Sequence, residues 1–138
     1  MNSARRSVWF TSEDLADPAV TGALTAAAQR GVDCEIVMTD NPKWHPAYAT
    51  LSAAGRQVAT YPNKANSLYV HEKLVLDDAG TPDATMLLGS QNATATSLTR
   101  NRELSVWLTA AQAPDILTAA AATFTADRTG ATRWNNTR

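Results

Sequence analysis

The sequence has a single cysteine, Cys34, among its 138 residues. One cysteine excludes a disulfide within the chain and a zinc site built from several cysteines. Cys34 lies in the apolar run 32–38, which is typical of a buried strand. We therefore predict that it packs there as a small hydrophobic side chain.

Long hydrophobic runs are also absent. No apolar run approaches the roughly 20 residues that a membrane-spanning helix needs. The first six residues include two arginines, but no apolar segment follows them, so this stretch is not a signal peptide. If this chain is a fragment of a longer precursor, the signal peptide would lie outside it and the protein could still be secreted. The compartment therefore stays open.

Charge of either sign is scarce. Charged residues make up 18% of the chain, hydrophobic residues 44%, and the formal net charge is −1. This balance is typical of a globular protein and excludes a disordered one. It also excludes a global basic field that would attract nucleic acid, so any binding of a polyanion has to be local. The length is that of one domain, which we expect to span residues 1–138.

Strand-like and helix-like patterns alternate along the chain. Ser12 is the expected cap of the first helix, and Gly31 its expected end. The order predicts an α/β fold in which helices flank a mixed β-sheet. A polar tail, 133–138, is expected to fray. The predicted strands cover residues 7–11, 32–39, 57–60, 68–76, 85–88 and 102–108, and the predicted helices cover 18–30, 47–54 and 115–127.

The segment 68–76 carries the first candidate site residues. Side chains alternate between the two faces of a strand, so His71 and Lys73 are expected to share one face. An imidazole can act as a nucleophile or a general acid, and an ammonium group beside it suits a phosphoryl group. Taken alone, a His-x-Lys pair on a strand is more often a feature of the surface than part of a site. The side chains expected on the opposite, core-facing side are Leu68, Val70, Leu74 and Leu76.

Two later segments add polar groups. Gly89 permits a close approach of the backbone, and Ser90 and Asn92 offer hydrogen-bond donors on one face if the strand continues. The alternative is an ordinary strand-ending turn. Glu103 lies near the start of the next strand, where a carboxylate can hold the second nitrogen of the histidine. Its alternative role is that of an exposed acid paired with a nearby arginine.

The combined pattern His71-x-Lys73-x4-Asp78 followed by Gly89-Ser90-x-Asn92 resembles the signature of the phospholipase D superfamily. The flanks are similar too, in the Asn-Arg-Glu-Leu stretch 101–104 and in the opening strand and helix, 10–12 and 26–32. The resemblance runs from about residue 7 to residue 127. It implies a phospholipase D-like fold, a mixed sheet flanked by helices, and chemistry on a phosphodiester.

The resemblance also implies roles for individual residues. His71 would attack phosphorus or protonate the leaving oxygen, and Glu103 would orient it. Lys73 and Asn92 would bind the non-bridging phosphate oxygens, and Ser90 would assist at the same phosphate. This family is not expected to use a metal or any other cofactor.

Asp78 and Gln91 complete the candidate set. Asp78 matches the aspartate of the motif and is counted with the catalytic residues, but it falls on the opposite face from His71, which favours a structural role. Gln91 lies inside the second motif and is counted with the substrate-binding residues. The turn acids Asp77, Asp78 and Asp83 resemble a calcium loop only superficially, and a solvated turn is the better interpretation.

The sequence departs from the family pattern in two ways. The gap from Asp78 to Gly89 is a few residues longer than usual, which a longer hairpin loop would absorb. More seriously, the family's site uses two facing motifs, and this chain has one. His45, the only other histidine, has no His-x-Lys partner and is expected to be a loop residue near the mouth of the site.

Three interpretations follow. A homodimer could bring two copies of His71 to one phosphate. Alternatively, the chain is one half of a longer enzyme, as its abrupt start and its resemblance to the C-terminal half of two-motif bacterial members favour. A non-catalytic phosphate-binding domain is the third. Phospholipid is favoured over nucleic acid as the substrate, with hydrolysis and transfer both open. Lys43, Trp44 and Lys64 are candidates for a basic and aromatic rim suited to either substrate.

Overall fold

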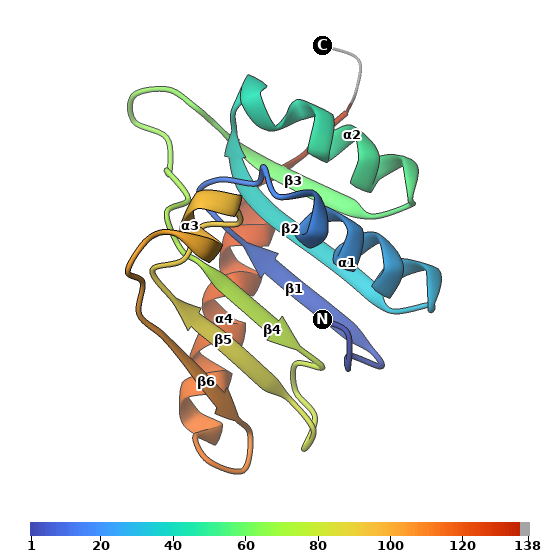
Figure 1. The fold of residues 1–138 in the computed structure, drawn as a ribbon, viewed down its shortest axis with the longest axis vertical. Helices are drawn as coiled ribbons and strands as arrows, with labels where there is room; N and C mark the ends of the chain where they lie inside the picture. Colours follow the sequence, from blue (N-terminus) through green and yellow to red (C-terminus); the bar gives the residue numbers. More distant parts are fainter. Residues whose placement is uncertain (136–138) are drawn as a thin grey trace.

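The computed structural model describes residues 1–135 of the chain (Figure 1). Part of the polar tail expected at 133–138 therefore lies outside the described residues. The elements in chain order are β1 (Ser7–Thr11), α1 (Pro18–Gln29), β2 (Asp33–Asp40), η1 (Pro42–Trp44), α2 (His45–Ala53), β3 (Gln57–Pro62), β4 (Leu74–Asp77), β5 (Thr85–Gly89), α3 (Ala95–Thr99), β6 (Ser105–Thr109), α4 (Pro114–Gly130) and β7 (Thr132–Arg133).

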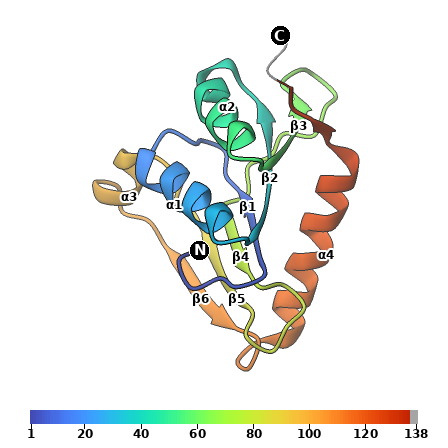
Figure 2. The ribbon, with the colours of Figure 1, turned by 90° about the vertical axis from the view of Figure 1, so that its right-hand side faces the viewer.

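The strands form one mixed sheet in the order β6-β5-β4-β1-β2-β3-β7. The neighbours β1, β2 and β3 run parallel, and the other pairs are antiparallel. Helices α1 and α2 cover one face over β1 to β3, and α4 crosses the opposite face (Figures 1 and 2). The α/β fold with helices on both faces of a mixed sheet is thus confirmed.

Two apolar cores lie on the two faces of the sheet. Strand β2 supplies both, because it is buried at six consecutive positions and its side chains alternate between them. Ile36 packs in the core under α1 and α2, and Val37 packs in the core under α4. Cys34 is fully buried in the first of these cores, as predicted. Within residues 1–135, no helix combines the length and apolarity needed to cross a membrane.

The start of α1 differs from the prediction. The helix begins at Pro18 and is capped by Asp17, whose carboxylate accepts from the amide of Ala19 at 2.8 Å. Ser12 does not cap it. Its hydroxyl accepts instead from the amide of Ala93 at 3.2 Å, so it ties the loop after β1 to the loop after β5. Gly31 ends the helix with a φ of 85°, as expected of glycine at that position.

The predicted strand 68–76 is wrong in its first half. Strand β4 begins only at Leu74, which pairs with Thr11 of β1 and Leu88 of β5. Because β1 ends at Thr11, residues 68–73 have no ladder to join. Leu68 is 48% exposed and does not contribute to the core, whereas the other three leucine and valine positions expected to face the core, Val70, Leu74 and Leu76, are buried.

Three smaller differences concern the C-terminal part. The predicted strand 102–108 begins at Ser105, after the short helix α3, which was not expected. Strand β7, also unexpected, pairs Thr132 and Arg133 with β3 at the edge of the sheet. The start of the tail is therefore ordered by backbone pairing rather than frayed.

Candidate active site

Four loops meet at one end of the sheet and carry the candidate residues. They follow β1 (12–17), precede β4 (68–73), follow β5 (90–94) and precede β6 (100–104). Strands β1, β4, β5 and β6 are neighbours in the sheet, so loops distant in sequence converge there. Because these four strands pair antiparallel, the ends of β1 and β5 lie beside the starts of β4 and β6, which brings residues near 13, 71 and 92 to one place.

The centre of the site is a carboxylate that the sequence analysis did not select. The Oε2 atom of Glu13 lies 3.1 Å from Nε2 of His71 and 3.3 Å from Nζ of Lys73. The side-chain amide of Asn92 donates to the same oxygen at 3.3 Å. Burial raises the pKa of Glu13, but hydrogen bonds from Asn92, Lys73 and Tyr69 outweigh it and hold that pKa below its ordinary value.

His71 and Lys73 differ in exposure. The side chain of Lys73 is only 8% exposed, and its ammonium also donates to the backbone carbonyl of His71 at 2.7 Å. The imidazole of His71 is 69% exposed and lies beside the ring of Tyr69, with ring centroids 6.4 Å apart. The lysine is therefore held in place beneath an imidazole that faces the solvent.

Asn92 is oriented from both ends of its amide. Its Nδ2 donates to Glu13 and to Asp14, and its Oδ1 accepts from the hydroxyl of Ser12 at 3.5 Å. Burial raises the pKa of Asp14, and the charge of Glu13 raises it further. At Gly89 the backbone makes the close approach that was predicted, because a Cβ there would overlap Ser105 and the backbone oxygen of Leu104.

Glu103 lies elsewhere than predicted. It accepts from the hydroxyls of Ser90 and Ser97, both at 2.6 Å, and from the side chain of Asn101 at 3.1 Å. These hydrogen bonds lower its pKa. The expected hydrogen bond to His71 is not among its contacts, and the carboxylate that contacts His71 is that of Glu13. The two acids are linked, because Ser97 also accepts from the amide of Asn92.

Asp78 has the structural position that its face in the strand suggested. Its carboxylate accepts from the backbone amides of Arg5, Arg6 and Ser7 at 2.7–3.1 Å. It is 6% exposed and its φ is +54°. Burial raises the pKa of Asp78, but the backbone hydrogen bonds lower it by more. The pKa of Asp78 therefore lies below its ordinary value.

The turn after β4 is therefore not a solvated acidic turn. Asp77 is buried as well as Asp78, and its carboxylate pairs with the amino group of Met1, while Asp83 is exposed. Among residues 1–135, no group of three or more histidines, cysteines and acids is placed to hold a metal ion.

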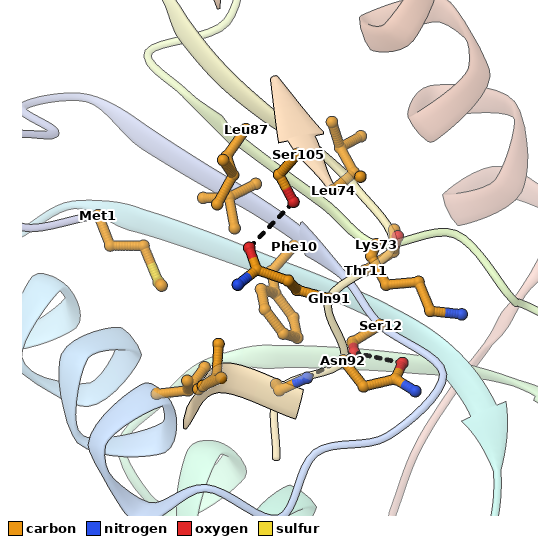
Figure 3. A pocket seen from close by; sticks show the side chains of 15 residues that line it. Met1, Phe10, Thr11, Ser12, Lys73, Leu74, Leu87, Gln91, Asn92 and Ser105 are labelled. Atoms are coloured by element: carbon orange, nitrogen blue, oxygen red, sulfur yellow. Dashed lines mark hydrogen bonds between the residues drawn. The ribbon is translucent and has the colours of Figure 1, made fainter. Parts of the chain in front are cut away.

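Ser90 and Gln91 connect the loop after β5 to the start of β6 through hydrogen bonds. Ser90 is exposed and accepts from the amide of Leu104 at 3.0 Å, and Gln91 accepts from the hydroxyl of Ser105 at 2.9 Å. Gln91 lines a cavity of about 90 Å³ together with Lys73 and Asn92. Figure 3 shows its side chain among those that line this cavity, hydrogen-bonded to Ser105. The apolar part of its wall includes Phe10, Val20, Leu74, Leu87 and Leu98.

His45 is not the loop residue that was expected. It opens α2, its Nε2 lies 2.7 Å from a carboxylate oxygen of Asp40, and its ring packs near Tyr48 and Trp134. Trp44 is half-buried against the core under α1 and α2, so it is a packed anchor.

Of the suggested basic rim, Lys43 and Lys64 are exposed. Lys43 lies with Trp44 along a groove between α1 and α2.

Comparison with known proteins identifies the family. A family model described as "Cardiolipin synthase, PLD-like domain" matches residues 1–128. The chain belongs to the phospholipase D-like family.

Two curated relatives are cardiolipin synthases A. The protein from Pseudomonas syringae pv. syringae is 33% identical over 112 residues, and that from Pseudomonas putida is 32% identical over 114 residues. The alignments cover 75% and 77% of this chain but only 22% of each relative. The chain thus spans about a fifth of the length of the relatives that it matches.

Solved structures agree on the fold. Nuc from Salmonella typhimurium, a phospholipase D family member, superposes with a TM-score of 0.82 at 22% identity, covering 98% of this chain and 86% of that one. NucT from Helicobacter pylori superposes with a TM-score of 0.77 at 17% identity, covering 96% and 85%. These likenesses support the phospholipase D-like architecture.

Sequence reasoning missed Glu13 and Tyr69. Glu13 directly follows Ser12, which was the expected cap of the first helix, and it was not selected as a site residue. The usable signal was Asp17-Pro18, a better cap and first helical residue, which leaves Glu13 in the loop that ends beside the site.

Proposed function

We propose that this domain carries half of a metal-independent phosphodiesterase site that acts on phospholipids through a phosphohistidine. The observation that supports it is the convergence of Lys73 Nζ, Asn92 Nδ2 and His71 Nε2 within 3.3 Å of one oxygen atom. Two donors and an imidazole around one oxygen suit a phosphoryl group, whose non-bridging oxygens gain charge as a nucleophile attacks.

The proposed reaction has two steps. A nitrogen of His71 forms a bond to phosphorus while the bond from phosphorus to the leaving alcohol oxygen breaks, and an acid from a second motif protonates that oxygen. Water or a second alcohol then attacks phosphorus, gives its proton to the same group and releases His71. Water makes the domain a hydrolase, and an alcohol makes it a transferase.

The remaining candidates support this centre indirectly. Ser90 assists at the phosphate, and Glu103 positions Ser90 and, through Ser97, the backbone of Asn92. Gln91 lines the adjoining cavity and contributes to substrate binding. Asp78 fixes the turn after β4, so its part in the site is to hold the chain that follows Lys73.

The second motif comes from another half. The relatives are about five times longer than the aligned region, which favours a partner half within a longer protein over a homodimer of this domain. The exposed apolar side chains around α3 and β6 suit such a partner. They are Leu98, Leu104, Val106 and Trp107, which are 41%, 79%, 47% and 56% exposed.

Phospholipid is the proposed substrate class on three grounds. The cavity beside Lys73 and Asn92 is mostly apolar. Leu68 and Tyr69 are about half exposed next to His71. The named relatives are cardiolipin synthases. The alternatives are a metal-independent nuclease that works as a homodimer and a phosphate-binding domain without turnover.

Hydrolysis of a chromogenic phosphodiester in excess chelator tests the chemistry, with His71→Ala as the control. We expect turnover that survives the chelator and disappears in the variant, and a mass measurement of the active species identifies a dimer or a partner half. Turnover that stops on chelation would contradict the metal-independent mechanism, and equal turnover in His71→Ala would contradict the site.

Substrate class is tested by competition. The same assay is repeated with phospholipid vesicles and with single-stranded DNA as competitors at matched phosphate concentration. We expect the vesicles to inhibit more strongly and to be consumed. Stronger inhibition by DNA, with its cleavage, would favour the nuclease.

A further inference from the structure

The Oε2 atom of Glu13 is surrounded as a phosphate oxygen would be. It is approached by the ammonium of Lys73, the amide of Asn92 and the imidazole of His71 at 3.1–3.3 Å. These are the same three groups that the proposed function assigns to phosphate. A carboxylate oxygen and a phosphate oxygen carry the same sign of charge and accept the same hydrogen bonds.

A phosphate and this carboxylate cannot use the three groups together. The Nδ2 group of Asn92 already donates to Glu13 and Asp14, and two anions within about 4 Å repel one another. Binding of phosphate therefore requires that Glu13 leaves.

We propose that Glu13 is a further residue of the site, which holds the place of a non-bridging phosphate oxygen and competes with phosphate for Lys73, Asn92 and His71. This inference rests on the proposed function. It makes Glu13 a determinant of specificity, because only a phosphodiester whose remaining contacts outweigh the lost carboxylate contacts is admitted.

The surroundings of Glu13 allow this exchange. The residue lies in the loop between β1 and α1, outside any ladder or helix, and its side chain is 25% exposed. Its contacts at the site are made by side-chain oxygens, so rotation of the side chain releases them without a change in the backbone. Tyr69, half exposed, donates to the other oxygen at 3.1 Å and holds the occluding position from the solvent side.

The neighbouring acid gives a matched control. Asp14 is one residue away, and its carboxylate accepts from Asn92 at 3.3 Å. The contacts of Oε2 with Lys73 and His71 belong to Glu13. Asp14→Asn therefore removes the same unit of charge from the same loop but leaves the occluding oxygen in place.

The test is an NMR titration of the whole chain with inorganic phosphate in wild type, Glu13→Gln, Glu13→Ala and Asp14→Asn. The imidazole resonances of His71 report binding, and those of His45, which pairs with Asp40, serve as an internal reference. We expect phosphate to bind roughly ten- to a hundredfold more tightly in Glu13→Ala. Glu13→Gln should lie between it and wild type, and Asp14→Asn should change the affinity by about threefold or less.

The outcomes separate this inference from the proposed function. Phosphate binding to wild type that is unchanged or weakened in both Glu13 variants would overturn the competition and leave the phosphate site intact. An equal gain in Asp14→Asn would overturn it too, since general charge would explain the effect. Failure of phosphate to shift His71 in any variant, including Glu13→Ala, would overturn both the inference and the proposed phosphate site.

Discussion

The loop 68–73 and strand β4 follow one another directly, yet their surroundings are opposite. Strand β4 lies between β1 and β5, and its Leu74 and Leu76 are buried. The preceding loop has no ladder partner and exposes Tyr69 and His71. Ten consecutive residues are thus divided into a part that offers chemical groups to the solvent and a part that holds the sheet together.

The largest effect is expected from His71→Ala. The side chain is 69% exposed and contributes no core packing, so the free energy of unfolding should stay within about 0.5 kcal/mol of wild type. Loss of the proposed nucleophile should lower turnover of a phosphodiester on the order of a thousandfold. Denaturant unfolding and initial rates measure the two effects on one preparation. A marked loss of stability in His71→Ala would contradict the view that the loop supplies chemistry and the strand supplies stability.

Leu74→Ala should do the reverse. Leu74 is 2% exposed in the core under α4, and its truncation should lower the free energy of unfolding by about 2–5 kcal/mol. The matched control is Leu68→Ala, since that leucine is 48% exposed and belongs to the loop. We expect the control to change stability by about 0.5 kcal/mol or less. Equal losses in thermal or chemical unfolding would show that both leucines are core residues.

Asp78→Asn tests the far end of β4. Removal of the charge weakens the hydrogen bonds from three backbone amides of the N-terminal segment, at a cost of about 1–3 kcal/mol. The native pKa of Asp78 is lowered, so its contribution is present above the ordinary aspartate pKa of about 4 and disappears as the pH falls through the lower native value.

Unfolding measured from pH 7 down to pH 2 checks this sign. The difference in the free energy of unfolding between wild type and Asp78→Asn should disappear as Asp78 is protonated. The exposed Asp83, in the same turn, provides the control substitution Asp83→Asn, which should change the free energy of unfolding at pH 7 by about 0.5 kcal/mol or less. A stability difference between wild type and Asp78→Asn that persists at pH 2 would exclude the carboxylate as its cause.

The same division explains what the sequence could predict. Helices α1 and α4, strand β5 and the buried positions of β4 follow from local periodicity, which one segment carries by itself. Residues 68–73 continue the apolar alternation of β4, so they look like strand. Whether they are strand depends on the length of β1, which ends at Thr11, and no local pattern contains that information.

The sequence identified candidate site residues only where residue types recur at the spacing of a motif. His71, Lys73, Ser90 and Asn92 stand out through motif spacing. Glu13 is 58 residues from His71 and 79 from Asn92, so its place at the centre depends on the order of strands in the sheet. The partner of Glu103 was wrong for the same reason, because the loop before β6 turns its carboxylate toward Ser90 and Ser97.

The smallest effect is expected where a single hydrogen bond connects the loop 68–73 to the sheet. The backbone amide of Val70 donates to the hydroxyl of Thr39 in β2 at 2.8 Å, and this bond ties the loop to the sheet where no ladder does. Thr39→Val leaves that buried amide without its acceptor and should cost about 1 kcal/mol. It should also lower kcat by up to roughly tenfold, because His71 follows directly and small displacements of a reacting group slow the reaction. Thr39→Ser retains the hydroxyl and should restore both. If Thr39→Val lowers stability but not kcat, the loop keeps His71 in place without this hydrogen bond. The position of the loop would then not depend on its anchor to the sheet.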